Sequence, residues 1–506
     1  MEFAPAPTLV FPTSVSTLQQ ERGTIRSQLR DTYNRLHSIE HDADFVHDEV
    51  APAFPDFPVV ANQRAGAWYV KPEEEKAHAY FKSTDGHTGE HSFNLRRANL
   101  ALLPLIKQRQ GIILVDSTRR GKRFPDALSK TIPTWCAVLN RARVLLLPPD
   151  TANSIVPLET WQEEGKLFTS PQAVGRSEHS QIEKKIEGWA QDLAKSAYDR
   201  SSLLMLERPL RPFFVSPAST LTAPQSAASF TSTYPVICCS ASKLAEEADG
   251  MERARGFSYV QGSGDDHEAW SKGLTPTIFW KHATEILMAG REEIDEVIAR
   301  ILLEEFSIKV KEESAVAAAP SSVATFSPIR STNLSFAFAV DAASLPSAPS
   351  PSAPFITIAA SKTASSSLPP MSAETGTAPQ PIDLVVRPGK AGYAAFFDSS
   401  SNSRLSHALS AATNKLKSIE EVRVAVLKNE EGNQSEANDL GVAFALVLLT
   451  RAFDANAALL STDSPTPAVT KDLIRGRLHW LLEVFPTVNP SRASLNKVNE
   501  LLMSRR

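Results

Sequence analysis

Short apolar runs that end at polar loops recur along this sequence and alternate with stretches of helical spacing. The runs GIILVD (111–116), YPVICCSAS (234–242) and VRVAVL (422–427) are each bounded by polar or turn residues. Runs of this length and composition are typical of strands that are buried on both faces of a sheet. Between them, apolar residues recur at near-helical intervals, for example over residues 282–307. This alternation predicts an α/β fold.

A change of composition divides the 506 residues into two blocks. Residues 311–380 are dominated by Ala, Ser and Pro, a composition that is typical of linkers. A chain of this length also exceeds what one hydrophobic core usually organises. We therefore expect a large N-terminal α/β domain at 1–310 that ends in one long helix over 282–307, a linker or insertion at 311–380, and a smaller α/β domain at 381–506.

Composition argues against several classes of protein. No apolar run approaches the roughly 20 residues of a membrane helix, and the start MEFAPAPTLVFPTSVS lacks the pattern of a signal peptide. We expect a cytoplasmic protein without a membrane partner. The cysteines Cys136, Cys238 and Cys239 form no Cys-x-x-Cys pair, which argues against a disulfide framework or a zinc site. Because the net charge is −4, any binding of RNA must come from local clusters of Lys and Arg.

The first polar cluster lies in the segment STDGHTGEHSFNLRRANL. Asp85 and His87 are candidates for acid–base catalysis, and Arg96 and Arg97 are candidates for binding phosphate. His87 and His91 are four residues apart, but the two glycines of the segment argue against a helix that would align them on a zinc ion.

The second cluster follows the expected strand GIILVD directly. The loop DSTRRGKRF contains Asp116, Arg119, Arg120, Lys122 and Arg123. Loops at strand ends bind ligands in open α/β sheets, so we expect these five residues to bind substrate or its phosphates. The alternative is a basic face that only water solvates.

The third cluster is FSYVQGSGDDHE, in which an expected strand ends at a glycine turn. Asp265, Asp266 and His267 follow that turn together. Carboxylates can hold Mg²⁺ and stabilise developing positive charge, and a histidine or an acid can deprotonate a hydroxyl. We expect Asp265 and Asp266 to hold the metal and all three residues to be catalytic. The alternative is a helix N-terminus at which acids are favoured by the dipole.

The fourth cluster follows the expected strand VRVAVL. A polar loop and an apolar helix from near Asp439 come next, an order that matches the phosphate-holding element of protein tyrosine phosphatases. Candidate phosphate-binding residues here are Lys428, Asn429, Gly432, Asp439 and Gly441. The section has no cysteine to act as nucleophile, so we expect this domain to bind phosphate at most.

Several of these segments together carry a family resemblance. The stretches STDGHTGEHSFNLRRANL, LVDSTRRGKRFPDALSKTIPTWCAVLNR, FSYVQGSGDDHEAWSKGLTPTIFWKH and FPTVNPSRASLNKVNELLM resemble the fungal initiator tRNA ribosyl phosphate transferases. The resemblance implies a large N-terminal domain of unusual fold and a smaller C-terminal domain that is similar to protein tyrosine phosphatases. It also implies the donor 5-phosphoribosyl 1-pyrophosphate and dependence on a divalent metal, Mg²⁺.

The activity that the resemblance implies is a glycosyl transfer. A phosphoribosyl group passes from the donor to the 2′-hydroxyl of a T-stem adenosine of the cytoplasmic initiator tRNA, which distinguishes this tRNA from elongators. We expect initiator tRNA as the partner, no DNA, and a monomeric enzyme. The alternative function is a noncatalytic tRNA-binding protein whose C-terminal domain is an inactive phosphatase that senses phosphate.

Overall fold

The computed structural model of the chain forms two compact units. The first unit contains residues Met1–Asn94, Leu102–Ala194 and Ser202–Phe306, and the second contains Leu95–Ala101, Lys195–Ser201 and Ser307–Arg506. The structure describes residues 31–503 except for 64, 73–77, 120, 147–153, 222, 246–250, 254–255, 317–324, 342–344, 346–354, 361–381, 387–395, 398–402, 419, 429–433, 461–468, 486–487 and 489.

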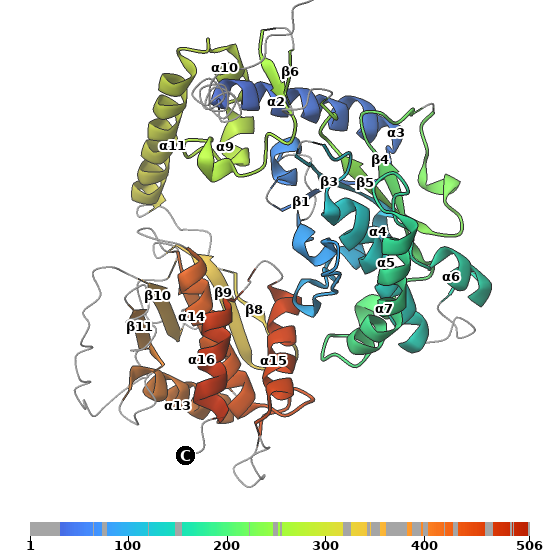
Figure 1. Cartoon of the computed structure of the whole chain (residues 1–506). Helices are drawn as coiled ribbons and strands as arrows, with labels where there is room; N and C mark the ends of the chain where they lie inside the picture. Colours follow the sequence, from blue (N-terminus) through green and yellow to red (C-terminus); the bar gives the residue numbers. More distant parts are fainter. Residues whose placement is uncertain are drawn as a thin grey trace, which may run out of the picture. The chain divides into compact units, whose positions relative to one another are not determined.

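The first unit is built around a five-stranded sheet in which every pair of neighbouring strands is parallel (Figure 1). Its strands are β1 Val59–Asn62, β2 His78–Ala79, β3 Ile112–Asp116, β4 Leu210–Val215 and β5 Tyr234–Ser240, in the order β2-β1-β3-β5-β4. All residues of β1, β3 and β5 are buried, as expected for strands that are covered on both faces.

The strand order reverses between β1 and β3. The chain leaves β1 towards β2 on one side, whereas β3 lies on the other side of β1 and leads on to β4 and β5. The carboxyl ends of β1 and β3 therefore flank a topological switch point. This is the place at which open α/β sheets bind their ligands.

Helices and short helical turns surround this sheet. The pair α5 Ile132–Leu146 and α7 Arg176–Ala194 pack against each other. A two-stranded antiparallel ribbon is formed by β6 Met251–Arg253 and β7 Ser258–Val260. The remaining helical elements are α2 Thr32–Asp44, η1 Phe45–Val50, α3 Ala51–Ala53, η2 Gly66–Tyr69, η3 Ser83–Gly86, α4 Leu102–Arg109, η5 Ala127–Thr131, α6 Leu158–Glu164, α8 Ser201–Leu204, η6 Ala227–Ser229, η7 His267–Ala269, α9 Pro276–Lys281, α10 Ala283–Met288 and α11 Ile294–Val316.

The second unit has its own five-stranded sheet, in the order β11-β10-β12-β9-β8. All pairs are parallel except β8 with β9. Helix α14 packs on this sheet and is buried along most of its length, as expected for a helix that is apolar all round. The elements are β8 Ser327–Pro328, β9 Leu334–Val340, β10 Ile356–Ala360, β11 Ile382–Val386, α13 Arg404–Lys417, β12 Val422–Leu427, α14 Gln434–Ala452, α15 Lys471–Val484 and α16 Arg492–Met503.

Two segments from the N-terminal half of the sequence are part of the second unit. They are 95–101, which contains η4 Leu95–Arg97, and 195–201. The ring of Tyr198 stacks on His479 of α15 with centroids 4.5 Å apart, and its hydroxyl donates a 2.6 Å hydrogen bond to the carbonyl of Leu95. The core of the second unit is therefore covered in part by residues that are distant in sequence.

The mixed α/β class and several elements are as the sequence predicts. The runs GIILVD, YPVICCSAS and VRVAVL form β3, β5 and β12, and the apolar C-terminal run forms α14. Among the described residues, no helix is both long enough and apolar enough to cross a membrane.

Two expectations need correction. The single helix expected over 282–307 is broken, because α10 ends at Met288 and α11 begins only at Ile294. Gly290, a poor helix former, lies in the intervening turn and accepts hydrogen bonds from Glu293 and Ile294 through its carbonyl. The expected linker 311–380 contains β8, β9 and β10 of the second sheet. Its Ala- and Ser-rich composition hid the strands SFAFAV and ITIAA.

Candidate functional site

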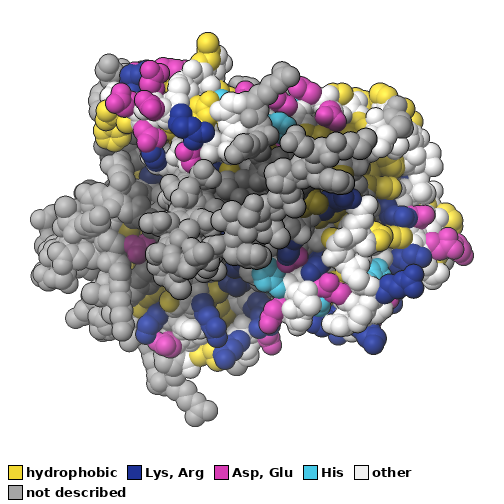
Figure 2. Space-filling model, turned by 45° about the horizontal axis from the view of Figure 1, so that its top comes forward, with side chains coloured by type: hydrophobic (Ala, Val, Ile, Leu, Met, Phe, Trp, Pro, Cys, Tyr) yellow, Lys and Arg dark blue, Asp and Glu magenta, His cyan; other side chains and the backbone are white. Residues whose placement is uncertain are grey.

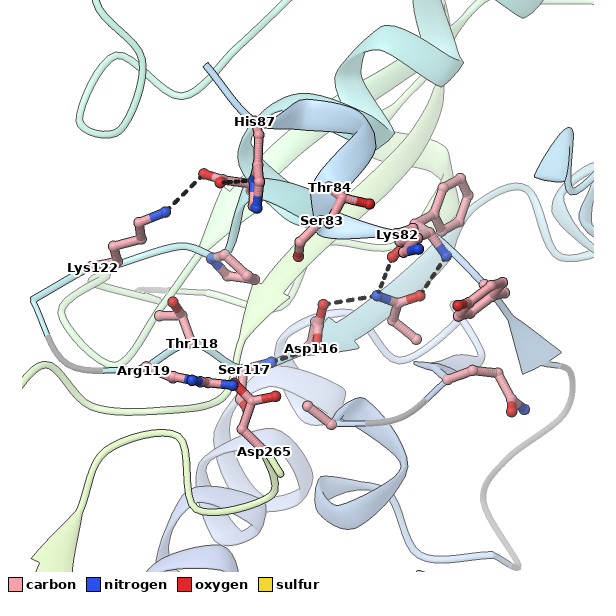
Figure 3. Close-up of a pocket in the computed structure, with 17 residues that line it drawn as sticks. Lys82, Ser83, Thr84, His87, Asp116, Ser117, Thr118, Arg119, Lys122 and Asp265 are labelled. Carbon is pink, nitrogen blue, oxygen red and sulfur yellow. Dashed lines mark hydrogen bonds and ion pairs between the residues drawn. The ribbon is translucent and has the colours of Figure 1, made fainter. Parts of the chain in front are cut away.

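A cavity of about 460 Å³ lies at the switch point of the first sheet (Figure 3). This volume is within the range of about 300–1,000 Å³ that is typical of small-molecule sites. The cavity is lined by the ends of β1 and β3, by η3, and by loop residues that follow β1, β2, β3 and β7. Its lining residues are Asn62, Gln63, Ala65, Tyr80, Phe81, Lys82, Ser83, Thr84, His87, Asp116, Ser117, Thr118, Arg119, Lys122, Pro125, Asp126 and Asp265.

Asp116, the last residue of β3, is a buried carboxylate in the cavity wall. Only 5% of the residue is exposed. Its Oδ2 accepts a 2.8 Å hydrogen bond from Nδ2 of Asn62, and its Oδ1 accepts one of 2.8 Å from the backbone N–H of Ser117. Burial raises the pKa of Asp116 to about 7, although these two hydrogen bonds act to lower the pKa.

Asn62, the last residue of β1, also forms two hydrogen bonds with the backbone of Phe81. Its Nδ2 donates to the carbonyl of Phe81 at 3.0 Å, and its Oδ1 accepts from the N–H of Phe81 at 2.7 Å. Because Asn62 also donates to Asp116, it ties the segment after β2 to the carboxylate at the end of β3. The side-chain orientations of both residues are thereby fixed.

The loop after β3 lies against the glycine turn that precedes Asp265. Gly262 has φ +72°, and a Cβ atom there would lie 2.7 Å from the carbonyl oxygen of Thr118, so only glycine fits. Nε of Arg119 donates to Oδ2 of Asp265 at 2.7 Å, and its Nη2 lies 2.8 Å from Oδ2 of Asp266. The hydrogen bond that Arg119 donates to Asp265, together with the negative charges of both acids, raises the pKa of Arg119.

An ionic network forms the opposite wall of the cavity. Nδ1 of His87 lies 2.8 Å from Oδ2 of Asp126, and the other oxygen of Asp126 lies 3.1 Å from Nζ of Lys122 (Figure 3). Lys130 lies 3.4 Å from the same oxygen, and 2.8 Å from Glu178. Asp126 thus shares its charge among one histidine and two lysines.

The structure brings five of the predicted site residues to this cavity. They are His87, Asp116, Arg119, Lys122 and Asp265. These residues come from three separate segments, which strand order places at one edge of the sheet.

Other predicted residues of the first unit are described but do not line the cavity. Asp266 is exposed and paired with Arg119, the ring of His267 lies 6.0 Å from that of Trp68, and Asp85 lies in η3. Arg123 donates instead to Gln172 at 2.7 Å. Arg120 lies outside the described residues.

The predicted phosphate-binding residues of the second unit have other surroundings. Arg96 and Arg97 lie in η4, where Arg96 donates to the carbonyl of Pro490 at 3.5 Å. Asp439 is buried and accepts a 2.8 Å hydrogen bond from the N–H of Ser491. Lys428 pairs with Asp341 at 2.6 Å.

Gly441 packs against the second sheet. A Cβ atom at Gly441 would lie 2.4 Å from a methyl group of Val426 in β12, so the glycine permits close packing of helix on strand. Asn429 and Gly432 lie outside the described residues.

A preformed metal site is not found in the part of the chain that the structure describes. Among the described residues, no group of three or more His, Cys, Asp and Glu side chains gathers in a way that could hold a metal ion. The expected ligands Asp265 and Asp266 are both paired with Arg119. On the face shown in Figure 2, Lys and Arg side chains lie among Asp and Glu side chains, so attraction of phosphate depends on local cations such as those at the cavity.

Among the cavity residues that were not predicted from the sequence, three carry charge or hydrogen bonds that matter for the site: Asn62, Lys82 and Asp126. Asn62 ends the short apolar run PVVAN, and a polar residue at the end of a buried strand is the signal that could have found it. Asp126 lies ten residues after Asp116, at the start of the next helical segment, where an acid also suits the helix dipole. Lys82 carries no pattern that separates it from other lysines.

Two domains of one protein family match the N-terminal and the C-terminal parts of the chain. A family domain described as the Rit1 N-terminal domain matches residues 25–303, and one described as the Rit1 DUSP-like domain matches residues 382–502. No solved structure matches.

Two curated relatives illustrate the similarity. An uncharacterised protein of Schizosaccharomyces pombe is 43% identical over 279 residues, which cover 55% of this chain and 58% of that protein. The tRNA A64-2′-O-ribosylphosphate transferase of Saccharomyces cerevisiae is 40% identical over 284 residues, 53% of each chain. The chain thus spans little more than half the length of these relatives. Since the N-terminal family domain alone covers more than half of its residues, the chain belongs to the Rit1 family.

Proposed function

We propose that this protein transfers a phosphoribosyl group from 5-phosphoribosyl 1-pyrophosphate to the 2′-hydroxyl of an adenosine in initiator tRNA. The relative from S. cerevisiae is named for ribosyl phosphate transfer to the 2′-oxygen of A64 in tRNA. The observation that carries the proposal is the cavity of about 460 Å³ at the switch point, which lies in the unit that matches the Rit1 N-terminal domain and combines cations with carboxylates.

The cavity offers what the two ends of the donor need. Lys82, Arg119 and Lys122 can bind phosphates, and the hydroxyls of Ser83 and Thr118 can add hydrogen bonds. In the reaction, the 2′-oxygen forms a bond to C1 of the donor ribose while the bond from C1 to pyrophosphate breaks, and its electron pair leaves with pyrophosphate. C1 becomes positively charged in between, and carboxylates stabilise that charge.

A divalent metal, Mg²⁺, belongs to the proposal as a companion of the donor. Mg²⁺ is commonly bound by one or two carboxylates together with substrate phosphates, so it needs no preformed protein cluster. Asp265 is the candidate ligand at the cavity, and Asp266 lies next to it. When bound, the ion would neutralise charge on pyrophosphate.

We propose that the second unit is a phosphatase-like domain without phosphatase activity. The order β12, loop, α14 supports this, and residues 381–506 contain no cysteine that could act as nucleophile. The unit would bind a phosphate at most, through the loop after Lys428. We also propose that the protein is a cytoplasmic monomer whose macromolecular partner is initiator tRNA, with no role for DNA.

Mass spectrometry of the product tests the transferase proposal directly. The full-length protein is incubated with the donor, Mg²⁺ and unmodified initiator tRNA, and the RNA is digested for analysis. A phosphoribosylated dinucleotide containing A64 is the expected product, and an elongator tRNA or an initiator tRNA with a 2′-deoxy nucleotide at that position serves as the matched control. Tight binding of tRNA without any product would favour a noncatalytic tRNA-binding protein instead.

A further inference from the structure

Three carboxylates line the cavity, and they differ in what neutralises them. Asp265 is paired with Arg119 at 2.7 Å, and Asp126 is paired with Lys122 at 3.1 Å and with Lys130. Within the described part of the chain, the contacts of the Asp116 carboxylate are instead with neutral groups, the amide of Asn62 and the N–H of Ser117. A carboxylate without a cationic partner is the one that can most readily accept a proton.

The position of Asp116 is fixed from both sides before any substrate binds. Each carboxylate oxygen accepts one hydrogen bond, so each retains a lone pair for a further donor. Asn62 cannot turn away from Asp116 without losing its two bonds to the backbone of Phe81. Such fixed orientation is what a general base requires.

We propose that Asp116 is the general base of the transfer, and that Asn62 is the residue that positions it. The assignment rests on the proposed function. Asp116 accepts the proton of the attacking 2′-hydroxyl as the 2′-oxygen bonds to C1 of the donor ribose, and pyrophosphate leaves with the electron pair of the broken bond. The protonated carboxyl then releases its proton to water.

Burial supports this role. It raises the pKa of Asp116 to about 7, and the charge of Asp265 acts in the same direction. A base is most effective when its pKa lies near the working pH. His87 is the rival base, but its side chain is 50% exposed, and the carboxylate that would orient it is shared with two lysines.

The dependence of kcat on pH tests the assignment, with wild type, Asp116→Asn and His87→Gln compared. In wild type kcat should rise with pH through an apparent pKa near 7. Asp116→Asn should lower kcat by about a hundredfold or more and abolish this rise, with the Kd for tRNA nearly unchanged. His87→Gln should keep the rise. Loss of the rise in His87→Gln, or its persistence in Asp116→Asn, would overturn the assignment.

Asn62 has a matched control elsewhere in the same unit. Asn140 is also buried and brackets backbone in the same way, donating to Gly165 and Leu210 and accepting from the N–H of Leu210. In the wild type, the hydrogen bond from Asn62 stabilises the charged form of Asp116. Asn62→Ala removes this bond, so the pKa of Asp116 and with it the rise of kcat should move to higher pH. Asn140→Ala should lower the stability of the protein without moving the rise of kcat. An equal shift in both variants, or none in Asn62→Ala, would show that Asn62 does not position the base.

The outcomes separate this inference from the proposed function. No product from wild type would overturn the function and the assignment with it. Product formation with a pH profile that belongs to another residue would overturn the assignment alone. Thermal melting establishes that each variant is folded, and if Asp116→Asn does not fold, the His87→Gln profile decides alone.

Discussion

Arg119 holds two consecutive acids at once, with Nε donating to Asp265 at 2.7 Å and Nη2 lying 2.8 Å from Asp266. Only Asp265 lines the cavity. The two acids thus share Arg119 as a partner, but only one of them lines the cavity. A substitution of either acid is therefore the control for the same substitution of the other.

Asp265→Asn should lower kcat by about a hundredfold while the affinity for tRNA stays nearly unchanged. The reason is that the carboxylate acts on charge that develops only during the reaction and not on the bound tRNA. Asp266→Asn, at a side chain that is 65% exposed, should lower kcat only a few fold. Steady-state kinetics of both variants check this. Equal losses would mean that both acids act through Arg119 and that access to the cavity is irrelevant.

Lys122 and Arg123 are neighbouring cations whose side chains have different surroundings. Lys122 lines the cavity, whereas Arg123 binds Gln172. Lys122→Ala should raise the KM for the donor about tenfold, which corresponds to ~1.4 kcal/mol, and should weaken the dependence of binding on salt. Arg123→Ala is the matched control and should change the KM for the donor little. Initial rates at several donor and salt concentrations measure both effects, and a larger change in Arg123→Ala would place the phosphate site elsewhere.

Gly262 and Gly256 both have positive φ, +72° and +84°, but only Gly262 is crowded. Gly262→Ala should lower the free energy of unfolding by ~2–4 kcal/mol, because a methyl group would press on the carbonyl of Thr118 in addition to the strain in the backbone. Gly256→Ala should cost only ~1–2 kcal/mol. Urea unfolding followed by circular dichroism gives both values. Equal losses would show that the close approach of the two loops contributes nothing.

His479 should make the second unit sensitive to acid. Burial lowers the pKa of His479 to about 4, below the ordinary value of about 6.5. The unfolded chain therefore binds the proton more tightly, and stability that is present above pH 6.5 is lost as the pH falls towards 4, by up to ~3 kcal/mol. His479→Gln should flatten this dependence, as measured by urea unfolding at pH 7 and pH 4.5. An unchanged slope in the variant would assign the acid sensitivity to other groups.

Thiol reagents should leave the native protein intact. Cys136, Cys238 and Cys239 are buried, and burial raises the pKa of each thiol, so the reactive thiolate is scarce. Iodoacetamide should label the unfolded chain but not the native one, and the native chain should not hydrolyse an aryl phosphate. Labelling is read by mass spectrometry of the intact chain. Hydrolysis abolished by alkylation would reveal thiol chemistry.

The local sequence pattern was sufficient to predict the buried strands, but it could not predict which distant segments lie next to them. GIILVD could be assigned as β3 because apolar residues and a polar end need no distant partner to be recognised. The pairing of Arg119 with Asp265 joins residues separated by 146 positions, and no periodicity encodes it. The ends of β1 and β3 meet only because strand order places them side by side.

The same difference separates the site residues that could be predicted from those that could not. Asp116 ends a strand that the sequence makes obvious, and Arg119 and Lys122 follow it, so their place at a ligand-binding edge could be predicted. Asn62 ends a strand of only four residues, which is too short for its apolar pattern to be distinctive. Strands β9 and β10 were missed for a related reason, because Ala and Ser weaken the contrast on which strand patterns depend.

The two segments that belong to the second unit, 95–101 and 195–201, are synthesised before the rest of that unit. Both emerge from the ribosome long before α15, on which Tyr198 stacks. Since translation adds about 5–20 residues per second, these segments wait many seconds for their partner helix. The ring of Tyr198 lacks its stacking partner His479 in that interval, so a nascent chain that stalls between residues 201 and 471 should expose this ring more than the complete protein does.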